Sequence, residues 1–245
     1  MLSHGQVACE WFDYGLTMAL LPRDLLWRAI ALGAAFLAAA SAILAGLALL
    51  PSEFSPRASQ AEVPGSVIHV SPDGQCGGQR PCFSQVQPAV KLAGGGATIR
   101  IHSGRYSESV LIDGKNRRAS SELERIVIEA DPEATPGSVV LTAPGSSCSD
   151  GAVIRISRST LVTLRGLTIV DGGGYAVRLA GGADRNLGIQ IERNRFFRNG
   201  SMACGGAIRI DRGNRDTLIA NNVIQLAGRN GIWITDVTGK DVEIF

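Results

Sequence analysis

The stretch GAIRI at residues 206–210 decides the fold, because the same short element recurs along the chain. It returns as GAVIRI at 151–156, YAVRL at 175–179 and NGIWI at 230–234. Most of its positions alternate between apolar and polar, which is the period-two pattern of a half-buried β-strand. A strand element that recurs at intervals of roughly 20–30 residues is typical of a solenoid.

A second element repeats with the same rhythm. It occurs as RGLTI at 165–169, RNRFF at 193–197 and NNVIQ at 221–225. Within it, Gly166, Asn194 and Asn222 follow one another at intervals of 28 residues. A coil of this length, with two or three short strands, has the size of one turn of a parallel β-helix. In such a turn, alternate apolar side chains point inward, and we expect asparagines at one corner to stack and hydrogen-bond along the axis.

Further strands are expected wherever apolar alternation is bounded by glycine, asparagine or aspartate. They are 67–70, 98–102, 110–112, 126–129, 139–142, 153–156, 161–170, 176–179, 188–192, 207–210, 217–220, 232–235 and 242–245. A leucine-rich repeat is the rival architecture, but its leucine spacing and helical segments are missing. The pattern therefore favours an all-β solenoid.

One amphipathic helix is expected over residues 83–93, and Gly94 follows it. Its apolar face is predicted to contain Phe83, Val86, Val90, Leu92 and Ala93. Pro88 has to lie in the first turn, because a proline in the helix interior breaks the hydrogen-bond ladder. We expect this helix to cover the N-terminal end of the solenoid, where core and strand edges would otherwise be open.

The start of the repetitive region reads VSPDG at 70–74, then a cysteine-bearing loop, a short helix and GGATIRIHSGRYSE at 95–108. In these features it resembles right-handed parallel β-helix proteins of the pectin-lyase-like superfamily. The resemblance implies a right-handed parallel β-helix over residues 66–245 with an N-terminal capping helix. It does not imply one activity, since that superfamily includes polysaccharide lyases, hydrolases, epimerases, esterases, adhesins and proteins without catalysis.

The pattern stops in mid-strand at Phe245, whereas proteins of this type continue for more coils. Two explanations remain open at this point. Either the chain is truncated, or its last coil is covered by a partner or by self-association.

An apolar segment precedes the repeats. Residues 29–50 contain no charged side chain and are long enough to cross a membrane as a helix. Arg23 and Arg28 lie before this segment, while only Arg57 follows closely. The positive-inside rule then places residues 1–28 in the cytoplasm and the repeats outside it.

We therefore expect a single-pass membrane protein whose C-terminal domain lies in the periplasm or at the cell surface. Residues 51–65 contain prolines and polar residues and are predicted to be a linker. Secretion after signal-peptide cleavage near Ala61 is the alternative. The true start is open between Met1 and Met18.

The cysteines agree with an oxidising compartment, because four of the five lie after the apolar segment. Disulfides are expected between Cys76 and Cys82 and between Cys148 and Cys204. No metal site is indicated, since no Cys-x2-Cys pair and no compact aspartate cluster for Ca²⁺ is found, and the histidines are scattered. The formal net charge of +2 gives no reason to expect nucleic acid as a partner.

One position of the repeated strand suggests a ligand. Between its two inward apolar residues it holds Arg155, Arg178, Arg209 and Trp233. In a parallel β-helix these side chains point outward from adjacent coils, about 4.8 Å apart. Arginine suits carboxylate or sulfate groups, and an aromatic ring can stack on a sugar, so the row predicts a surface that binds acidic polysaccharide. A solvated face balanced by Asp211 and Asp236 is the alternative.

Catalysis is a separate hypothesis. A lyase or epimerase needs a base and a cation beside the uronate carboxylate. Tyr175 next to the row is a candidate base, and Asp171, Asp211 and Asp236 at comparable strand ends are candidate carboxylates for hydrolysis. The alternative for each is an ordinary packing or turn role. Asp73 is expected to be a turn residue, and His102 a surface residue.

Three functions thus remain open. The first is an exported protein that contacts polysaccharide through the Arg/Trp row. The second is a lyase or epimerase acting on acidic glycans, and the third is a structural or adhesive solenoid without catalysis.

Overall fold

The computed structural model describes residues 62, 64–143, 151–182, 185–201, 204–235 and 241–245. The chain divides into two units, Met1–Ala58 and Ser59–Phe245, and only the second contains described residues. The predicted segments 1–28 and 29–50 lie outside the described part, as does most of the predicted linker. Among the described residues, no helix has the length and apolar character that membrane crossing requires.

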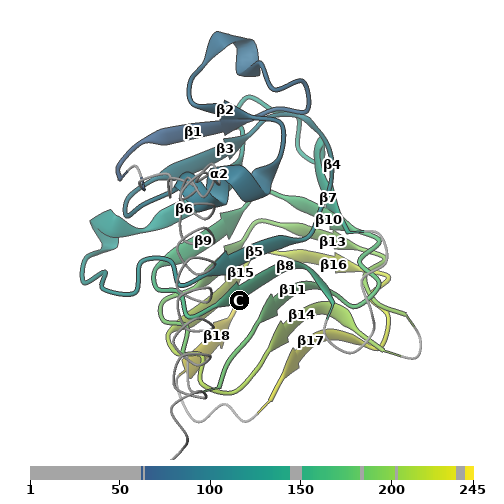
Figure 1. Ribbon diagram of the computed structural model, residues 1–245. Coiled ribbons are helices and arrows are strands. Elements are labelled where there is room, and N and C mark those ends of the chain that lie inside the picture. Colours follow the sequence, from purple (N-terminus) through teal and green to yellow (C-terminus); the bar gives the residue numbers. More distant parts are fainter. Residues whose placement is uncertain (1–61, 63, 144–150, 183–184, 202–203, 236–240) are drawn as a thin grey trace, which may run out of the picture. The chain divides into compact units, whose positions relative to one another are not determined.

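Three parallel sheets form the second unit (Figure 1). Sheet I has the order β18-β15-β12-β9-β6-β3-β1-β2, sheet II the order β16-β13-β10-β7-β4, and sheet III the order β17-β14-β11-β8-β5. Sheet I contains β1 (Val67–Val70), β2 (Cys82–Phe83), β3 (Thr98–Ile101), β6 (Ile126–Ala130), β9 (Val162–Arg165), β12 (Gln190–Glu192), β15 (Thr217–Ala220) and β18 (Val242–Ile244). Sheet II contains β4 (Gly104–Ser107), β7 (Val139–Thr142), β10 (Thr168–Val170), β13 (Arg195–Phe197) and β16 (Val223–Gln225). Sheet III contains β5 (Val110–Asp113), β8 (Ala152–Ser157), β11 (Tyr175–Leu179), β14 (Gly206–Ile210) and β17 (Asn230–Ile234).

From β3 onward the chain visits sheets I, II and III in turn, and each strand from β3 to β15 pairs in parallel with the strand three further along. Figure 1 shows this as layers, with β5, β8, β11, β14 and β17 lying one below the next. The arrangement is compatible with the parallel β-helix solenoid that the repeats predict. The fold is mostly β, as the composition and turn signals indicate.

The single long strand expected over 161–170 is wrong. The chain turns a corner there, so that β9 ends at Arg165 in sheet I and β10 begins at Thr168 in sheet II. Gly166 forms the corner with φ at +70°, a conformation that glycine adopts without the steric cost of a side chain. The second repeated element is therefore a corner followed by a sheet II strand.

The core consists of inward side chains stacked at the same position of successive coils. In sheet I one such column is Ile99, Ile128, Leu164, Ile191 and Ile219. All five side chains are at most 2% exposed. Burial of each stabilises the fold by about 1.5–3 kcal/mol, which explains why the alternation is kept in every coil.

Asparagines hold the corners, as the 28-residue spacing predicts. The Asn194 side chain accepts from Leu167 N at 3.0 Å and donates to Asn222 Oδ1 at 3.2 Å. Asn186 donates to Asn214 Oδ1 at 2.7 Å at a different corner. Each side chain thus replaces the backbone hydrogen bonds that a sharp turn leaves open.

The predicted helix is shorter than expected, because α2 spans Val86–Leu92 and Phe83 belongs to β2. Its buried residues are Val86, Ala89 and Val90, which join the core beside β1 and β3. Pro88 lies in its first turn, as required. The Glu108 carboxylate accepts from Val86 N at 2.7 Å and Gln87 N at 3.0 Å, so an anion satisfies free amides at the positive end of the helix.

The disulfide expected between Cys76 and Cys82 is confirmed, with a Cα–Cα distance of 5.9 Å. It closes the loop between β1 and β2. Cys204 is also disulfide-bonded. Cys148, the partner predicted for Cys204, lies outside the described residues.

Candidate functional site

The Arg/Trp row lies on sheet III, as its spacing predicts. Arg178 is the register partner of both Arg155 and Arg209, and Arg209 is the partner of Trp233. Leu111 of β5 extends the row by one coil at the Arg155 end. Sequence alone could align these residues because each occupies the same place in a repeated strand of five or six residues.

Two of the three arginines are neutralised in part by one carboxylate. Arg178 Nε donates to Asp211 Oδ2 at 2.8 Å, and Arg209 Nε donates to Asp211 Oδ1 at 2.6 Å. The Asp211 side chain is only 15% exposed, so water screens these contacts weakly. The Asp211 carboxylate therefore links the guanidinium groups of two adjacent coils.

The aromatic end of the row is a stack. The Arg209 guanidinium lies 4.8 Å from the centroid of the Trp233 ring and 5.6 Å from that of Tyr175. The two ring centroids are 6.3 Å apart. Trp233 is 38% exposed, whereas Tyr175 is 1% exposed. A side chain buried to that degree is poorly placed to remove a proton from a polymer on the outer face, so its burial does not favour Tyr175 as the base.

Arg155 is in a different setting at the other end. It is exposed and lines a groove of about 590 Å³ together with Leu111, Asp113 and Arg158. The Arg158 guanidinium holds the pKa of Asp113 below its ordinary value, with Ser157 contributing a further hydrogen bond. The groove therefore contains the ionised Asp113 carboxylate, which is paired with Arg158, and beside it the exposed Arg155 guanidinium.

The candidate carboxylates Asp171 and Asp211 are not brought together. Asp171 directly follows β10 of sheet II and lies four residues before β11 begins, whereas Asp211 directly follows β14, so at least the length of a sheet III strand separates them. A five-residue strand is about 13 Å long, more than the roughly 5–9.5 Å that separates the carboxyl groups of glycoside hydrolases. Asp171 instead pairs with Arg198 at 3.0 Å. Asp236 lies outside the described residues.

Sheet I carries a charged row that the sequence reading missed. Arg100, Glu129, Arg165 and Glu192 are register partners on four adjacent strands, so their charges alternate along the axis. Arg100 lies 3.5 Å from Glu129, Arg165 Nε donates to Glu129 at 3.2 Å, and Arg165 lies 3.6 Å from Glu192. The Glu129 carboxylate raises the pKa of Arg165. The signal was present, since all four residues occupy one position of the repeat.

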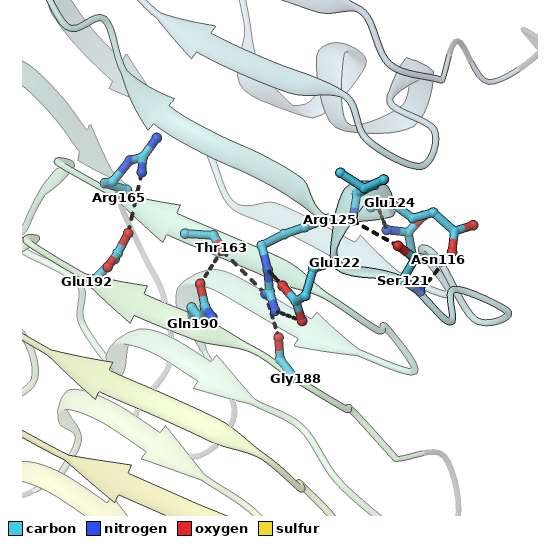
Figure 2. A network of polar contacts seen from close by, with 11 residues as sticks. Asn116, Ser121, Glu122, Glu124, Arg125, Thr163, Arg165, Gly188, Gln190 and Glu192 are labelled. Carbon is cyan, nitrogen blue, oxygen red and sulfur yellow. Dashed lines mark hydrogen bonds and ion pairs between the residues drawn. The ribbon is translucent and has the colours of Figure 1, made fainter.

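A second polar network ties three coils together near this row, and Figure 2 shows its members. Arg125 donates to both Glu122 oxygens at 2.7 and 2.9 Å and to Gly188 O at 2.7 Å. Thr163 donates to Gln190 at 3.1 Å on the next strand. Arg125 thus binds Glu122 within its own coil and reaches Gly188 two coils away, while Thr163 contacts the adjacent strand, so the network joins three coils.

The two remaining polar residues, Asp73 and His102, lie in different settings. Asp73 is a turn residue as expected, because it accepts from Ser71 Oγ at 2.7 Å and from Gln75 N at 2.9 Å. These hydrogen bonds lower the pKa of Asp73. His102 is not simply a surface residue, since its Nδ1 lies 2.8 Å from Asp131 Oδ2 and its side chain is 24% exposed.

The described part of the chain contains no group of three or more histidine, cysteine, aspartate and glutamate side chains placed to hold a metal ion. Comparison with known proteins found no family model, no curated protein and no solved structure that matches this chain.

The shared carboxylate leads to a first prediction. Replacing Asp211 with asparagine should lower the free energy of unfolding by about 1–2 kcal/mol, because two adjacent guanidiniums lose the carboxylate that they share while the shape is kept. Chemical denaturation at low salt measures the change. Asp171→Asn, which removes a more exposed partner of Arg198, is the matched control and should cost less than about 0.5 kcal/mol. Equal losses in the two variants would contradict this role for Asp211.

Proposed function

We propose that this chain is an exported protein that binds acidic polysaccharide along the outer face of sheet III. The observation that supports it is the register of Arg155, Arg178, Arg209 and Trp233 on four consecutive coils. Three strand spacings separate Arg155 from Trp233, or about 14 Å, enough for a short stretch of an extended glycan. A guanidinium can pair with a uronate or sulfate group, and the exposed indole face offers a platform for a sugar ring.

The pairing at Asp211 is compatible with such a surface. Arg178 and Arg209 are held in place by it, so less side-chain freedom is lost when a ligand docks. Arg155 adds an exposed guanidinium at one end of the row. In this proposal Arg155 makes the first ion pair with the polymer, and Trp233 provides the stacking contact.

We also infer that the protein is exported and related to β-helix proteins of the pectin-lyase-like superfamily. The apolar segment 29–50 anchors the protein, and the solenoid lies outside the cytoplasm, or is released after cleavage near Ala61. The Cys76–Cys82 disulfide supports an oxidising compartment. The motifs at 70–74 and 95–108 support a right-handed coil of the pectin-lyase-like type.

A structural or adhesive solenoid is the second candidate, and a specific observation favours it. The charges of sheet I are paired along their row, and the two central arginines of sheet III share Asp211. Paired charges of this kind stabilise coil stacking without any ligand. Self-association through the last coil, where Leu226 and Ile244 are exposed, belongs to this second candidate.

Binding calorimetry with alginate, pectate and a glycosaminoglycan tests the proposal. We expect Arg155→Ala and Trp233→Ala each to weaken the affinity for the preferred polymer about fivefold to tenfold, since each loses one charged or stacking contact worth about 1 kcal/mol. Arg195→Ala is the matched control. It removes an exposed strand arginine from sheet II and should leave the affinity unchanged.

Three other outcomes separate the candidates. Absence of binding to all three polymers would reject the proposal and favour the structural solenoid. Equal weakening by Arg195→Ala would show that only net charge matters. Release of unsaturated oligosaccharides during the titration would make the chain a lyase.

A further inference from the structure

Two histidines and an aspartate meet on three adjacent strands of sheet I. His69 lies in β1, His102 directly follows β3, and Asp131 directly follows β6. His102 Nδ1 is 2.8 Å from Asp131 Oδ2, and His102 Nε2 is 3.2 Å from His69 Nδ1. The two rings are stacked, with centroids 5.4 Å apart. His102 therefore uses both ring nitrogens, one toward a carboxylate and one toward the other histidine.

The number of protons on the His69 and His102 rings decides whether this arrangement can form. The contact between the two rings needs one N–H and one lone pair. It survives with both rings neutral, and with one added proton on either ring. With two added protons, both facing nitrogens carry hydrogen, and two positive rings meet at 3.2 Å. The closed arrangement thus excludes the second proton.

The surroundings act in the same direction. Burial, then the neighbouring His102 and Arg100, lower the pKa of His69, and Asp131 opposes them. Among the described residues, the charged and titratable groups around the pair include Arg100, Glu129, Asp131, Glu133 and Tyr106. Arg100 is paired with Glu129, and the Tyr106 hydroxyl donates to the backbone oxygen of His102 at 2.8 Å. Burial raises the pKa of Tyr106, so this group stays neutral.

The disulfide loop is attached at the same place. Its return strand β2 pairs with β1 at His69 and Cys82, and His69 N donates to Pro81 O at 2.8 Å. Loop residues Cys76, Gly77 and Gln79 line a pocket of about 330 Å³. His102, Arg100 and Asp131 form other parts of its wall.

We propose that His69, His102 and Asp131 form a pH-operated latch that holds the Cys76–Cys82 loop on the first coils at neutral pH and releases it when both histidines are protonated. The role is independent of polysaccharide binding, since the latch lies on sheet I and the Arg/Trp row on sheet III.

The direction of the pH dependence follows from the linkage between proton binding and closure of the latch. The closed form binds fewer protons than the released form, because the burial and the neighbouring His102 that lower the pKa of His69 belong to the closed pair. Closure is therefore fully favoured above about pH 6.5, the ordinary histidine pKa, and is lost progressively as the pH falls. The two histidines are coupled, so the titration belongs to the pair.

Reduction of the Cys76–Cys82 disulfide by a phosphine reports release. The full-length chain in mild detergent is sampled from about pH 7.5 to about pH 5, alkylated, and peptide-mapped at both cysteines. The rate is divided by that of His69→Gln at each pH, which cancels the pH dependence of the reagent. We expect this ratio to rise by up to about tenfold per pH unit below about 6.5. His4→Gln removes the remaining histidine outside the cluster and should behave as the wild type.

Asp131→Asn should move release to a higher pH, because the carboxylate no longer supports the first proton on His102. A ratio that stays constant with pH, or an equal change in His4→Gln, would overturn the latch. If His69→Gln does not fold, histidine NMR titration of the wild type decides. Separate apparent pKa values, one well below the ordinary value, support the latch, and two independent ordinary titrations reject it.

Discussion

Replacing Asn194 with leucine is expected to lower the free energy of unfolding by about 2–4 kcal/mol. Asn194 is 1% exposed, and its side chain accepts from Leu167 N and donates to Leu164 O and to Asn222. Leucine fills the same space but leaves the buried Leu167 N–H without an acceptor. In a domain of this size the melting temperature should fall by roughly 5–15 °C, measured by calorimetry.

Asn222→Leu is the matched control within the same corner column. Asn222 also donates to a backbone oxygen, that of Ile191, at 2.7 Å, but it is half-buried. Water can replace part of the hydrogen bonding of the Asn222 side chain. The loss in the free energy of unfolding should therefore be clearly smaller than at Asn194. A larger loss at Asn222 would show that burial does not set the strength of these corners.

Phe196→Ala is expected to cost about 3–5 kcal/mol. The ring is 1% exposed and fills the inner face of sheet II between its register partners Ile169 and Ile224. The adjacent coils are held by their own sheet hydrogen bonds, so we expect the resulting space to close only in part. Urea unfolding should show a lower midpoint concentration than in the wild type. The slope of the unfolding free energy against urea concentration is obtained from the same transition.

The next residue gives the control for this change. Phe197 points the other way in the same strand, and Arg198 lies over its ring with the guanidinium carbon 4.9 Å from the centroid. Phe197→Ala should cost less than about 1 kcal/mol, since the ring is only partly buried. Similar losses for the two phenylalanines would contradict the inward and outward assignment in β13.

The repeats explain why the architecture and the Arg/Trp row could be predicted. Arg178 and Arg209 occupy the same place in five-residue strands, so their alignment follows from pattern alone. The sequence indicated Asp211 as a balancing charge beside Arg209, but its pairing with Arg178 could not be assigned in the same way. Asp211 is 33 residues from Arg178, and the contact exists only because one coil lies directly on the next.

The histidine cluster was missed for a related reason. His69, His102 and Asp131 stand in the first coils, where the disulfide loop and α2 interrupt the regular spacing. His102 and Asp131 also follow their strands instead of lying in them. No repeat period connects the three residues, so only the folded register brings them together.

The connections at the corners differ in length, and this difference indicates where the chain can accept an insertion. Only Arg193 and Asn194 separate β12 from β13, and only Asn221 and Asn222 separate β15 from β16. The connection from β13 to β14 is longer than the one from β16 to β17, yet the sheet III strands that follow remain in register. Peptide tags or foreign epitopes inserted at the β13–β14 corner should therefore be tolerated, whereas insertion at a two-residue corner should disrupt coil stacking.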